Sequence, residues 1–534
     1  MQPPATACTP MPSGTAPATA ADPVAGWLRG LDVLVLGLGH SGLAMARWCA
    51  HAGARVTVWD SRESPPQAEA LGRAGRLVGG ALDAARAADF QLLLKSPGLA
   101  PRDAQIVPLL EAARERGTAV LGELDLFARA LADLRTGCGY APRLLAVTGT
   151  NGKTTTATMT ARLVERAGRR VALAGNVGPT MLDTLASTLA QPQDDWPEVW
   201  VLELSSFQLE GGGDGARGFE ADAAAVLNLV PDHLDWHRTM DAYAAAKARI
   251  FAGPGAKIVN RDDPRVEAML PAPPAPAKGR KPPPAAPVWR FGLDAPRQPG
   301  DFGLVVESGI AWLVRALPAD ETDRPRKGEA TELHLQRLMP ADAMRVRGRH
   351  NAANALAALA LATAIGCPLA PMLHGLREYR GEPHRVEPIG AVGGIEAFDD
   401  SKGTNVGATV AALEGLGADL APGRLALVLG GDGKGQDFAP LAAPVARFAR
   451  AVALIGRDAP TIESALQGCG VPMVRHATLQ DATAWCFGQA RVGDAVLLSP
   501  ACASLDMFRD YVQRAEVFVA AVRALAGERG EVVA

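Results

Sequence analysis

The segment that most constrains the fold of this chain is residues 143–164, where an apolar strand pattern runs into a glycine-rich loop and then a helix pattern. The strand covers residues 143–148. Backbone amides of such a loop surround phosphate oxygens, its lysine neutralises their charge, and its hydroxyl groups can bind Mg²⁺. Val147 stands where the commonest form of this motif has its first glycine. The predicted triphosphate loop comprises Gly149, Thr150, Asn151, Gly152, Lys153, Thr154 and Thr155.

A second glycine-rich loop, Gly37-Leu-Gly-His-Ser-Gly42, lies between a predicted strand (31–37) and a predicted helix (41–51). Glycines there let the backbone approach a diphosphate, and the helix amides face its charge. Asp60 ends the next strand, where a carboxylate accepts hydrogen bonds from a ribose or a base. The pattern favours a nucleotide diphosphate site without identifying the nucleotide. A purely structural tight turn is the alternative.

Further short apolar runs read as buried parallel strands, because strands covered on both faces are apolar throughout. They lie at residues 90–95, 199–203, 223–228, 425–430, 451–455 and 495–499. Helix patterns alternate with them, which predicts an α/β fold with doubly wound sheets. We expect three domains: a Rossmann-like domain at 30–122, a central phosphate-loop domain at 123–381 and a Rossmann-like domain at 382–534. Residues 1–29 are expected to be a disordered tail, and the proline-rich residues 271–300 a flexible insertion.

Composition limits the partners that this chain can bind. The 534 residues carry a formal net charge of −3, so no global positive field attracts nucleic acid or an anionic membrane. No apolar run is long enough to span a bilayer, and the N-terminus does not resemble a secretory signal. The seven cysteines are scattered without metal-binding spacing. These features predict a cytoplasmic protein with small-molecule ligands.

Polar residues follow several of the predicted strands. Glu203 and His233 are candidate Mg²⁺ ligands, although each taken alone also fits a structural role. Lys247 lies in an alanine-rich helix, where composition alone suggests a solvated lysine. Three loops near the C-terminus, at 400–405, 430–434 and 499–504, contain lysines and hydroxyl groups that suit a small dicarboxylate. Ordinary glycine-rich turns are the alternative for these loops.

The two loops, followed by ELSSFQLE, DHLDWH and the Lys247 helix, resemble the Mur ligase superfamily over residues 31–525. The motifs DSKGTN, GGDGKGQDF and SPACASLDMF resemble the branch that adds D-glutamate to UDP-N-acetylmuramoyl-L-alanine. This resemblance implies an ATP-dependent ligase of peptidoglycan precursor synthesis that works through an acyl phosphate. Another acceptor amino acid is the nearest alternative. A nicotinamide-dependent oxidoreductase is suggested by the first loop alone.

The resemblance also implies roles for individual residues. It assigns the UDP substrate to Gly39, Ser41, Asp60, Ser61, Arg62, Ser96, Pro97, Gly98, Asn176, Ser205 and Gln208. It adds to the ATP loop Asn351, Asn354, Arg385, Asp400 and Lys402. It assigns D-glutamate to Thr404, Lys434, Ser504 and Tyr511, and metal binding to Thr154, Glu203, His233 and Lys247.

The catalytic residues implied in this way are Lys153, His233 and Lys247, the last as a carbamate formed with CO₂. The implied cofactors are ATP and two Mg²⁺ ions, and the implied state is a monomer. Tyr511 and Ala515 depart from the phenylalanine and glycine usual in the family.

Overall fold

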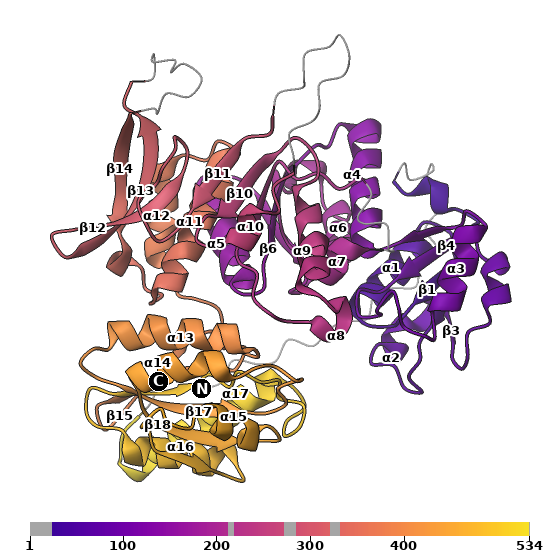
Figure 1. The fold of residues 1–534 in the computed structure, drawn as a ribbon. Helices are drawn as coiled ribbons and strands as arrows, with labels where there is room; N and C mark the ends of the chain where they lie inside the picture. The colour runs from indigo at the N-terminus through magenta and orange to yellow at the C-terminus, as the bar shows by residue number, and fades with distance from the viewer. Residues whose placement is uncertain (1–23, 212–217, 272–284, 321–331, 533–534) are drawn as a thin grey trace, which may run out of the picture. The chain divides into compact units, whose positions relative to one another are not determined.

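The computed structural model describes residues 24–211, 218–271, 285–320 and 332–532, and its chain divides into two compact units (Figure 1). The first unit contains Met1–Leu121 and Leu126–Ala141, and the second contains Gly122–Asp125 and Pro142–Ala534. The second unit carries two separate sheets, which define a central module and a C-terminal module. Both units alternate strands with helices, so the predicted α/β class is confirmed.

The first unit is built on a five-stranded parallel sheet in the order β3-β2-β1-β4-β5. Its strands are β1 (Asp32–Leu36), β2 (Arg55–Trp59), β3 (Arg76–Val78), β4 (Leu92–Lys95) and β5 (Ala119–Leu121). Its helices are α1 (His40–His51), α2 (Ala68–Leu71), α3 (Val107–Glu115) and most of α4 (Glu123–Cys138). The predicted glycine-rich loop joins β1 to α1, so it lies at the carboxyl end of the sheet.

The central module contains a nine-stranded sheet in the order β14-β13-β12-β11-β10-β9-β6-β8-β7. Six strands pair in parallel: β6 (Arg143–Thr148), β7 (Val171–Gly175), β8 (Val199–Glu203), β9 (Ala223–Val226), β10 (Ala256–Asn260) and β11 (Val288–Phe291). An antiparallel arm follows: β12 (Phe302–Glu307), β13 (Ile310–Pro318) and β14 (Leu333–Pro340). Most residues of this arm are half-buried or exposed, and the sequence analysis did not identify its strands.

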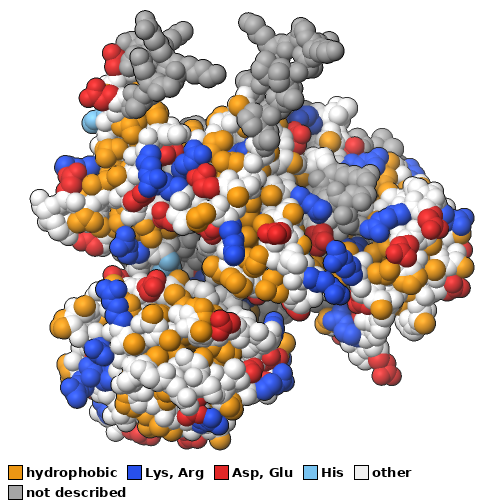
Figure 2. All heavy atoms as spheres, in the orientation of Figure 1, with side chains coloured by type: hydrophobic (Ala, Val, Ile, Leu, Met, Phe, Trp, Pro, Cys, Tyr) orange, Lys and Arg blue, Asp and Glu red, His pale blue; other side chains and the backbone are white. Residues whose placement is uncertain are grey.

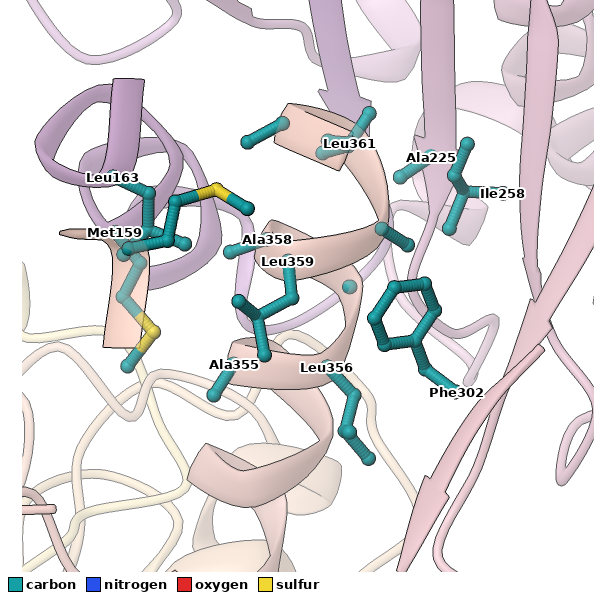
Figure 3. Packing of buried hydrophobic residues seen from close by; sticks show 14 of the residues in the cluster. Met159, Leu163, Ala225, Ile258, Phe302, Ala355, Leu356, Ala358, Leu359 and Leu361 are labelled. Atoms are coloured by element: carbon teal, nitrogen blue, oxygen red, sulfur yellow. The ribbon is translucent and has the colours of Figure 1, made fainter. Parts of the chain in front are cut away.

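Eight helices belong to the central module among the described residues: α5 (Lys153–Arg166), α6 (Met181–Leu189), α7 (Ser206–Glu210), α8 (Leu234–His237), α9 (Met240–Ala248), α10 (Pro264–Glu267), α11 (Arg349–Ala364) and α12 (Leu369–Glu378). Helix α11 forms the middle of the core, and eleven of its sixteen residues are buried. Figure 3 shows Met159 and Leu163 of α5 on one side of α11, with Ala225, Ile258 and Phe302 of the sheet on the other. Its many alanines let these layers approach closely.

The C-terminal module has a six-stranded sheet in the order β15-β16-β20-β17-β18-β19. Only β15 (Glu387–Val392) is antiparallel; the others are β16 (Ile395–Asp399), β17 (Leu425–Gly430), β18 (Ala449–Ile455), β19 (Met473–Arg475) and β20 (Ala495–Leu498). The accompanying helices are α13 (Val406–Asp419), α14 (Ala442–Phe448), α15 (Ala459–Ala465), α16 (Leu479–Gln489) and α17 (Tyr511–Glu528).

Three expectations about domain organisation differ from the structure. The expected tail includes a 3-10 helix at Gly26–Leu28, whose Leu28 is fully buried; residues 1–23 lie outside the described part. The expected flexible insertion includes β11, held by pairing with β10, whereas residues 272–284 lie outside the described part. The residues Leu126–Cys138 of α4 belong to the first unit, not to the central domain predicted from residue 123 onward.

The surface mixes charges of both signs. On the face drawn in Figure 2, Lys and Arg side chains lie among Asp and Glu side chains. In the part of the chain that the structure describes, no helix combines the length and the apolar character needed to cross a membrane.

Candidate active site

The triphosphate loop between β6 and α5 folds back onto its own lysine. Gly149 and Gly152 have φ angles of 154° and 80°, which are available to glycine and strained for other residues. Lys153 Nζ donates hydrogen bonds to the carbonyl oxygens of Gly149 (3.0 Å) and Thr150 (2.8 Å). Burial lowers the pKa of Lys153, and the charge of Glu203 opposes this effect. The loop is therefore folded around the ammonium group of Lys153.

Lys247 lies under the same loop. Its side chain is 1% exposed, and its Nζ donates to the carbonyl oxygen of Gly149 at 2.8 Å. The face of the Tyr243 ring lies 4.7 Å from Nζ. Burial, and then the charge of Lys153, hold the pKa of Lys247 well below its ordinary range. The interpretation of Lys247 as a solvated lysine is thus wrong.

Glu203 ends β8 with one carboxylate oxygen bound and one available. Its Oε1 accepts a hydrogen bond from Asn176 Nδ2 at 2.9 Å, while its buried Oε2 has no partner among the described residues. A buried carboxylate oxygen without a partner is costly unless a ligand binds it. Ser205 and Gln208, two further predicted residues, form the capping box that starts α7.

His233 precedes α8 in a left-handed conformation with a φ of 52°. Its Nε2 lies 3.6 Å from Asp232 Oδ2, and its ring meets the Phe207 ring edge-on. Burial lowers the pKa of His233, Asp232 raises it, and the charges of Lys153, Lys247 and Lys434 lower it again. A neutral imidazole is the form that binds a metal ion. Glu203 and His233 thus fit the chemistry of a divalent cation site.

A cavity of about 330 Å³ opens beside the triphosphate loop, between the two sheets of the second unit. It is lined by eight predicted ATP residues: Asn151, Gly152, Thr155, Asn351, Asn354, Arg385, Asp400 and Lys402. Sequence reasoning missed other wall residues, notably Asn228, Asn260, Asp262, Phe291, Leu293 and His350. Apolar Phe291 and Leu293 beside amides and a carboxylate suit a purine base and its ribose. Only their positions at or just after the ends of strands β9, β10 and β11, or next to Asn351, could have indicated them.

Charged residues of the C-terminal module reach this cavity. Arg385 donates a 2.6 Å hydrogen bond to Thr154 Oγ1, the hydroxyl group of the predicted magnesium ligand. Burial raises the pKa of Asp400 to about 7, although a hydrogen bond from Ser499 lowers it. Burial lowers the pKa of Lys402 to about 8, and its Nζ lies 3.6 Å from the centre of the Tyr511 ring.

The predicted acceptor residues lie on loops at one edge of the C-terminal sheet. Thr404, Lys434 and Ser504 follow β16, β17 and β20, three neighbouring parallel strands, and Tyr511 begins α17. The carboxyl ends of parallel strands are where ligands bind in such sheets. Lys434 is exposed and Ser504 is buried, so this edge of the sheet carries both a cation and a hydroxyl group.

The predicted UDP residues of the first unit lie around the loop between β1 and α1. Asp60 is buried; its Oδ2 accepts from the Leu38 amide at 2.7 Å and pairs with Arg62 at 2.8 Å. Burial would raise the pKa of Asp60, but these bonds lower it to about 2. Ser96 Oγ donates to the Gly37 carbonyl at 2.8 Å, which ties the Ser96-Pro97-Gly98 turn to the loop. Gly39 precedes α1, Ser41 lies in its first turn, and Ser61 is exposed.

One cluster was not predicted. Within the described ranges, the only three side chains of metal-binding type that lie together are those of His384, Glu387 and Asp399. His384 Nδ1 is 2.7 Å from Asp399 Oδ2, and Glu387 accepts a hydrogen bond from the His384 amide. These bonds fix the segment that carries Arg385, which accounts for the cluster without a metal ion.

Comparison with known proteins agrees with this geometry. Three family models match: the MurD-like N-terminal domain of Mur ligases at residues 31–122, the Mur ligase middle domain at 147–281 and the Mur ligase glutamate ligase domain at 384–502. The chain belongs to the Mur ligase family. It is similar to the UDP-N-acetylmuramoylalanine–D-glutamate ligase of Albidiferax ferrireducens, with 59% identity over 94% of this chain and 98% of that one. The ligase of the same name from Burkholderia pseudomallei is 56% identical over 93% and 98%.

Solved structures share the fold at low sequence identity. The UDP-N-acetylmuramate-alanine ligase of Thermotoga maritima matches with a TM-score of 0.53 and 18% identity, covering 92% of this chain and 99% of that one. The MurF ligase of Thermotoga maritima, solved in complex with ADP, matches with a TM-score of 0.53 and 16% identity, covering 96% and 98%. These similarities concern the fold alone.

Proposed function

We propose that the chain adds D-glutamate to UDP-N-acetylmuramoyl-L-alanine at the expense of ATP, in the synthesis of peptidoglycan precursors. The observation that carries this proposal is the 59% identity, over nearly the full length of both chains, to a ligase of that name. The cavity beside the triphosphate loop supports it, because its walls include both the loop and charged groups of the C-terminal module.

The reaction takes place in two steps. The alanyl carboxylate attacks the γ-phosphorus of ATP, the bond from phosphorus to the ADP oxygen breaks, and an acyl phosphate forms. The amine of D-glutamate then attacks the acyl carbon, loses a proton, and expels inorganic phosphate as the amide forms. The first step brings two anions together, so preorganised positive charge is the main requirement. Lys153 and Arg385 supply that charge around the loop.

Mg²⁺, when bound, would neutralise charge on the phosphoryl group during its transfer. The residues that would hold two such ions are Thr154, Glu203, His233 and Lys247 as a carbamate. The buried Glu203 Oε2, which has no hydrogen-bond partner among the described residues, supports this assignment. A buried lysine beside a second lysine favours its neutral amine, the form that reacts with CO₂. The carbamate replaces a cation with an anionic oxygen ligand and removes the repulsion between Lys247 and Lys153.

The other predicted residues form separate sets, and each set binds a different part of the substrates. Gly39, Ser41, Asp60, Ser61, Arg62 and the Ser96-Pro97-Gly98 turn hold the UDP group, and Asn176, Ser205 and Gln208 face the muramoyl part. Asn351, Asn354, Asp400 and Lys402 complete the ATP site. Thr404, Lys434, Ser504 and Tyr511 bind D-glutamate, whose two carboxylates need a cation and hydroxyl donors.

We also propose that the enzyme acts as a cytoplasmic monomer, with the C-terminal domain beginning close to residue 381. Among the described cysteines, Cys49, Cys367, Cys469, Cys486 and Cys502 are free thiols, as in proteins of reducing compartments. Sedimentation equilibrium giving the mass of two chains would contradict the monomer.

A coupled assay of ADP release tests the proposed reaction. With the UDP substrate and ATP present, D-glutamate is compared with L-glutamate, D-alanine and diaminopimelate. We expect ADP only with D-glutamate. ADP with L-glutamate or diaminopimelate alone would show a different acceptor specificity, and ADP with none of the four would contradict the ligase.

A further inference from the structure

Asn405 connects the predicted acceptor loop to the triphosphate loop. It directly follows Thr404, and it is only 6% exposed. Asn405 Nδ2 donates to Asn151 Oδ1 at 3.0 Å and to Asp232 Oδ2 at 3.2 Å. Asn151 Nδ2 donates back to Asn405 Oδ1 at 3.3 Å. One amide therefore contacts the loop for ATP and the residue that precedes His233.

The same side chain also starts α13. Asn405 Oδ1 accepts from the Ala408 amide at 2.9 Å, which makes Asn405 the N-cap of the helix. The cap needs only the oxygen of the side chain, whereas two of its three hydrogen bonds to the central module need its NH₂ group. The two functions can therefore be separated by substitution.

One face of α13 lies against the central module along its length. Gly407, Ala411 and Gly415 are spaced by four residues, so they share a face. A Cβ atom on Gly407 would lie 2.9 Å from Val230 Cγ2. A Cβ atom on Gly415 would lie 2.8 Å from His350 Nδ1. An alanine at either position would force the facing side chain to shift.

His350 fills the space between the helix and the central module. Its Nδ1 is buried without a hydrogen-bond partner among the described residues, because Gly348 and Gly415 cover that edge of the ring. The ring also forms a hydrogen bond with the backbone of Ala411. At the end of α13, Asp419 Oδ2 accepts from the Gly348 amide at 3.1 Å. Polar contacts thus fix both ends of a closely packed helix face.

We propose that Asn405 is a positioning residue for the ligation reaction: through its NH₂ group it holds the acceptor loop and the triphosphate loop in register, with the α13 face as the docking surface. This inference rests on the proposed function. It predicts that the amide of Asn405 matters for the use of ATP and D-glutamate together, and not for binding of the UDP substrate.

The first test compares two N-cap substitutions in the C-terminal module. Asn405→Ser retains an N-cap oxygen and removes the two hydrogen bonds that the NH₂ group donates to the central module. Thr478→Ser is the matched control, since Thr478 caps the exposed start of α16 with its Oγ1. We expect Asn405→Ser to lower kcat/KM for ATP and for D-glutamate by about tenfold. The thermal midpoint and the Kd for the UDP substrate alone should match those of Thr478→Ser.

The second test compares two helical glycines. Gly415→Ala places a methyl group against His350, whereas Gly488→Ala in α16 has open space around the new atom. Both changes raise helix propensity. We expect only Gly415→Ala to lower kcat/KM for ATP and D-glutamate. His350→Ala makes room for the methyl group. The double variant Gly415→Ala/His350→Ala should therefore show a smaller loss of kcat/KM than the product of the two single losses.

Kinetics of Asn405→Ser equal to those of the wild type, or an equal loss in Thr478→Ser, would overturn the proposal. If Asn405→Ser does not fold, the second test replaces the first. Identical kinetics of Gly415→Ala and Gly488→Ala would then overturn the proposal. Failure of the proposed function itself gives a different result, because the wild-type chain would then release no ADP with D-glutamate.

Discussion

The two buried lysines Lys247 and Lys257 are chemically alike but face different surroundings. Lys257 Nζ donates to the carbonyl oxygens of Phe251 and Gly253, far along the chain from the triphosphate loop. We predict that Lys247→Met lowers ligation by about 100-fold or more, since it removes the proposed carbamate. Lys257→Met should lose stability, by about 1–3 kcal/mol, and keep its activity.

ADP release measured over a range of bicarbonate concentrations checks this pair. The wild type should respond to bicarbonate depletion, and Lys247→Met should not. Full turnover by Lys247→Met would remove the basis for a carbamate.

Asp400 links the candidate site to the stability of the folded chain. Burial raises its pKa to about 7, against the lowering effect of Ser499. A carboxyl group with a raised pKa stabilises the fold while protonated, and this contribution is lost as the pH rises toward 7. Asp400→Asn should therefore stabilise the ligand-free protein at about pH 8, by on the order of a few kcal/mol, and much less at about pH 5.

Urea unfolding at the two pH values measures this difference. The exposed Asp437 of the same module, replaced by Asn, is the control and should show no such pH dependence. An Asp400→Asn protein with the pH profile of the wild type would contradict the assignment of the titration to Asp400.

At the scale of elements, α11 depends on close packing between α5 and the sheet (Figure 3). Leu359 in this helix is fully buried. We predict that Leu359→Ala lowers the free energy of unfolding by about 2–5 kcal/mol, because the cavity left between two layers cannot close easily. Val306→Ala, at an exposed position of β12, should change it by less than about 0.5 kcal/mol. Denaturant titrations measure both values.

Parallel strands were the elements most easily predicted from the sequence. The runs at 143–148, 199–203 and 425–430 match β6, β8 and β17, because burial on both faces leaves a continuous apolar signature. Strands β12 to β14 were missed, since most residues of that arm are half-buried or exposed and proline-rich sequence precedes it. Strand β11 was missed for the same reason, and its order comes from pairing with β10 rather than from its own residues.

The candidate site was predicted where one loop carries the chemistry, as at Gly152 and Lys153. Phe291 and His350 could not be predicted as cavity walls, because nothing local distinguishes a core aromatic residue from one that faces a ligand. The contacts of Asn405 join residues more than 170 positions apart in the chain. Contacts of this kind follow from the packing of the two modules, and they produce no recognisable motif or residue spacing in the sequence.

At the scale of the whole molecule, the predicted metal ligands come from different elements that are already folded. Removing divalent cations with EDTA should therefore stop ADP release without changing the thermal midpoint by more than about 2–4 °C. Added Mg²⁺ should restore turnover. ADP release at the original rate in EDTA would contradict a metal role for Glu203 and His233, and circular dichroism of the same samples controls for unfolding.

Lys153 makes two hydrogen bonds to carbonyl groups of its own loop. When ATP binds, the ammonium group of Lys153 exchanges these carbonyl partners for phosphate oxygens, and few residues of the loop need to become ordered. Nucleotide capture should accordingly cost little conformational entropy, and calorimetry should find it driven by enthalpy.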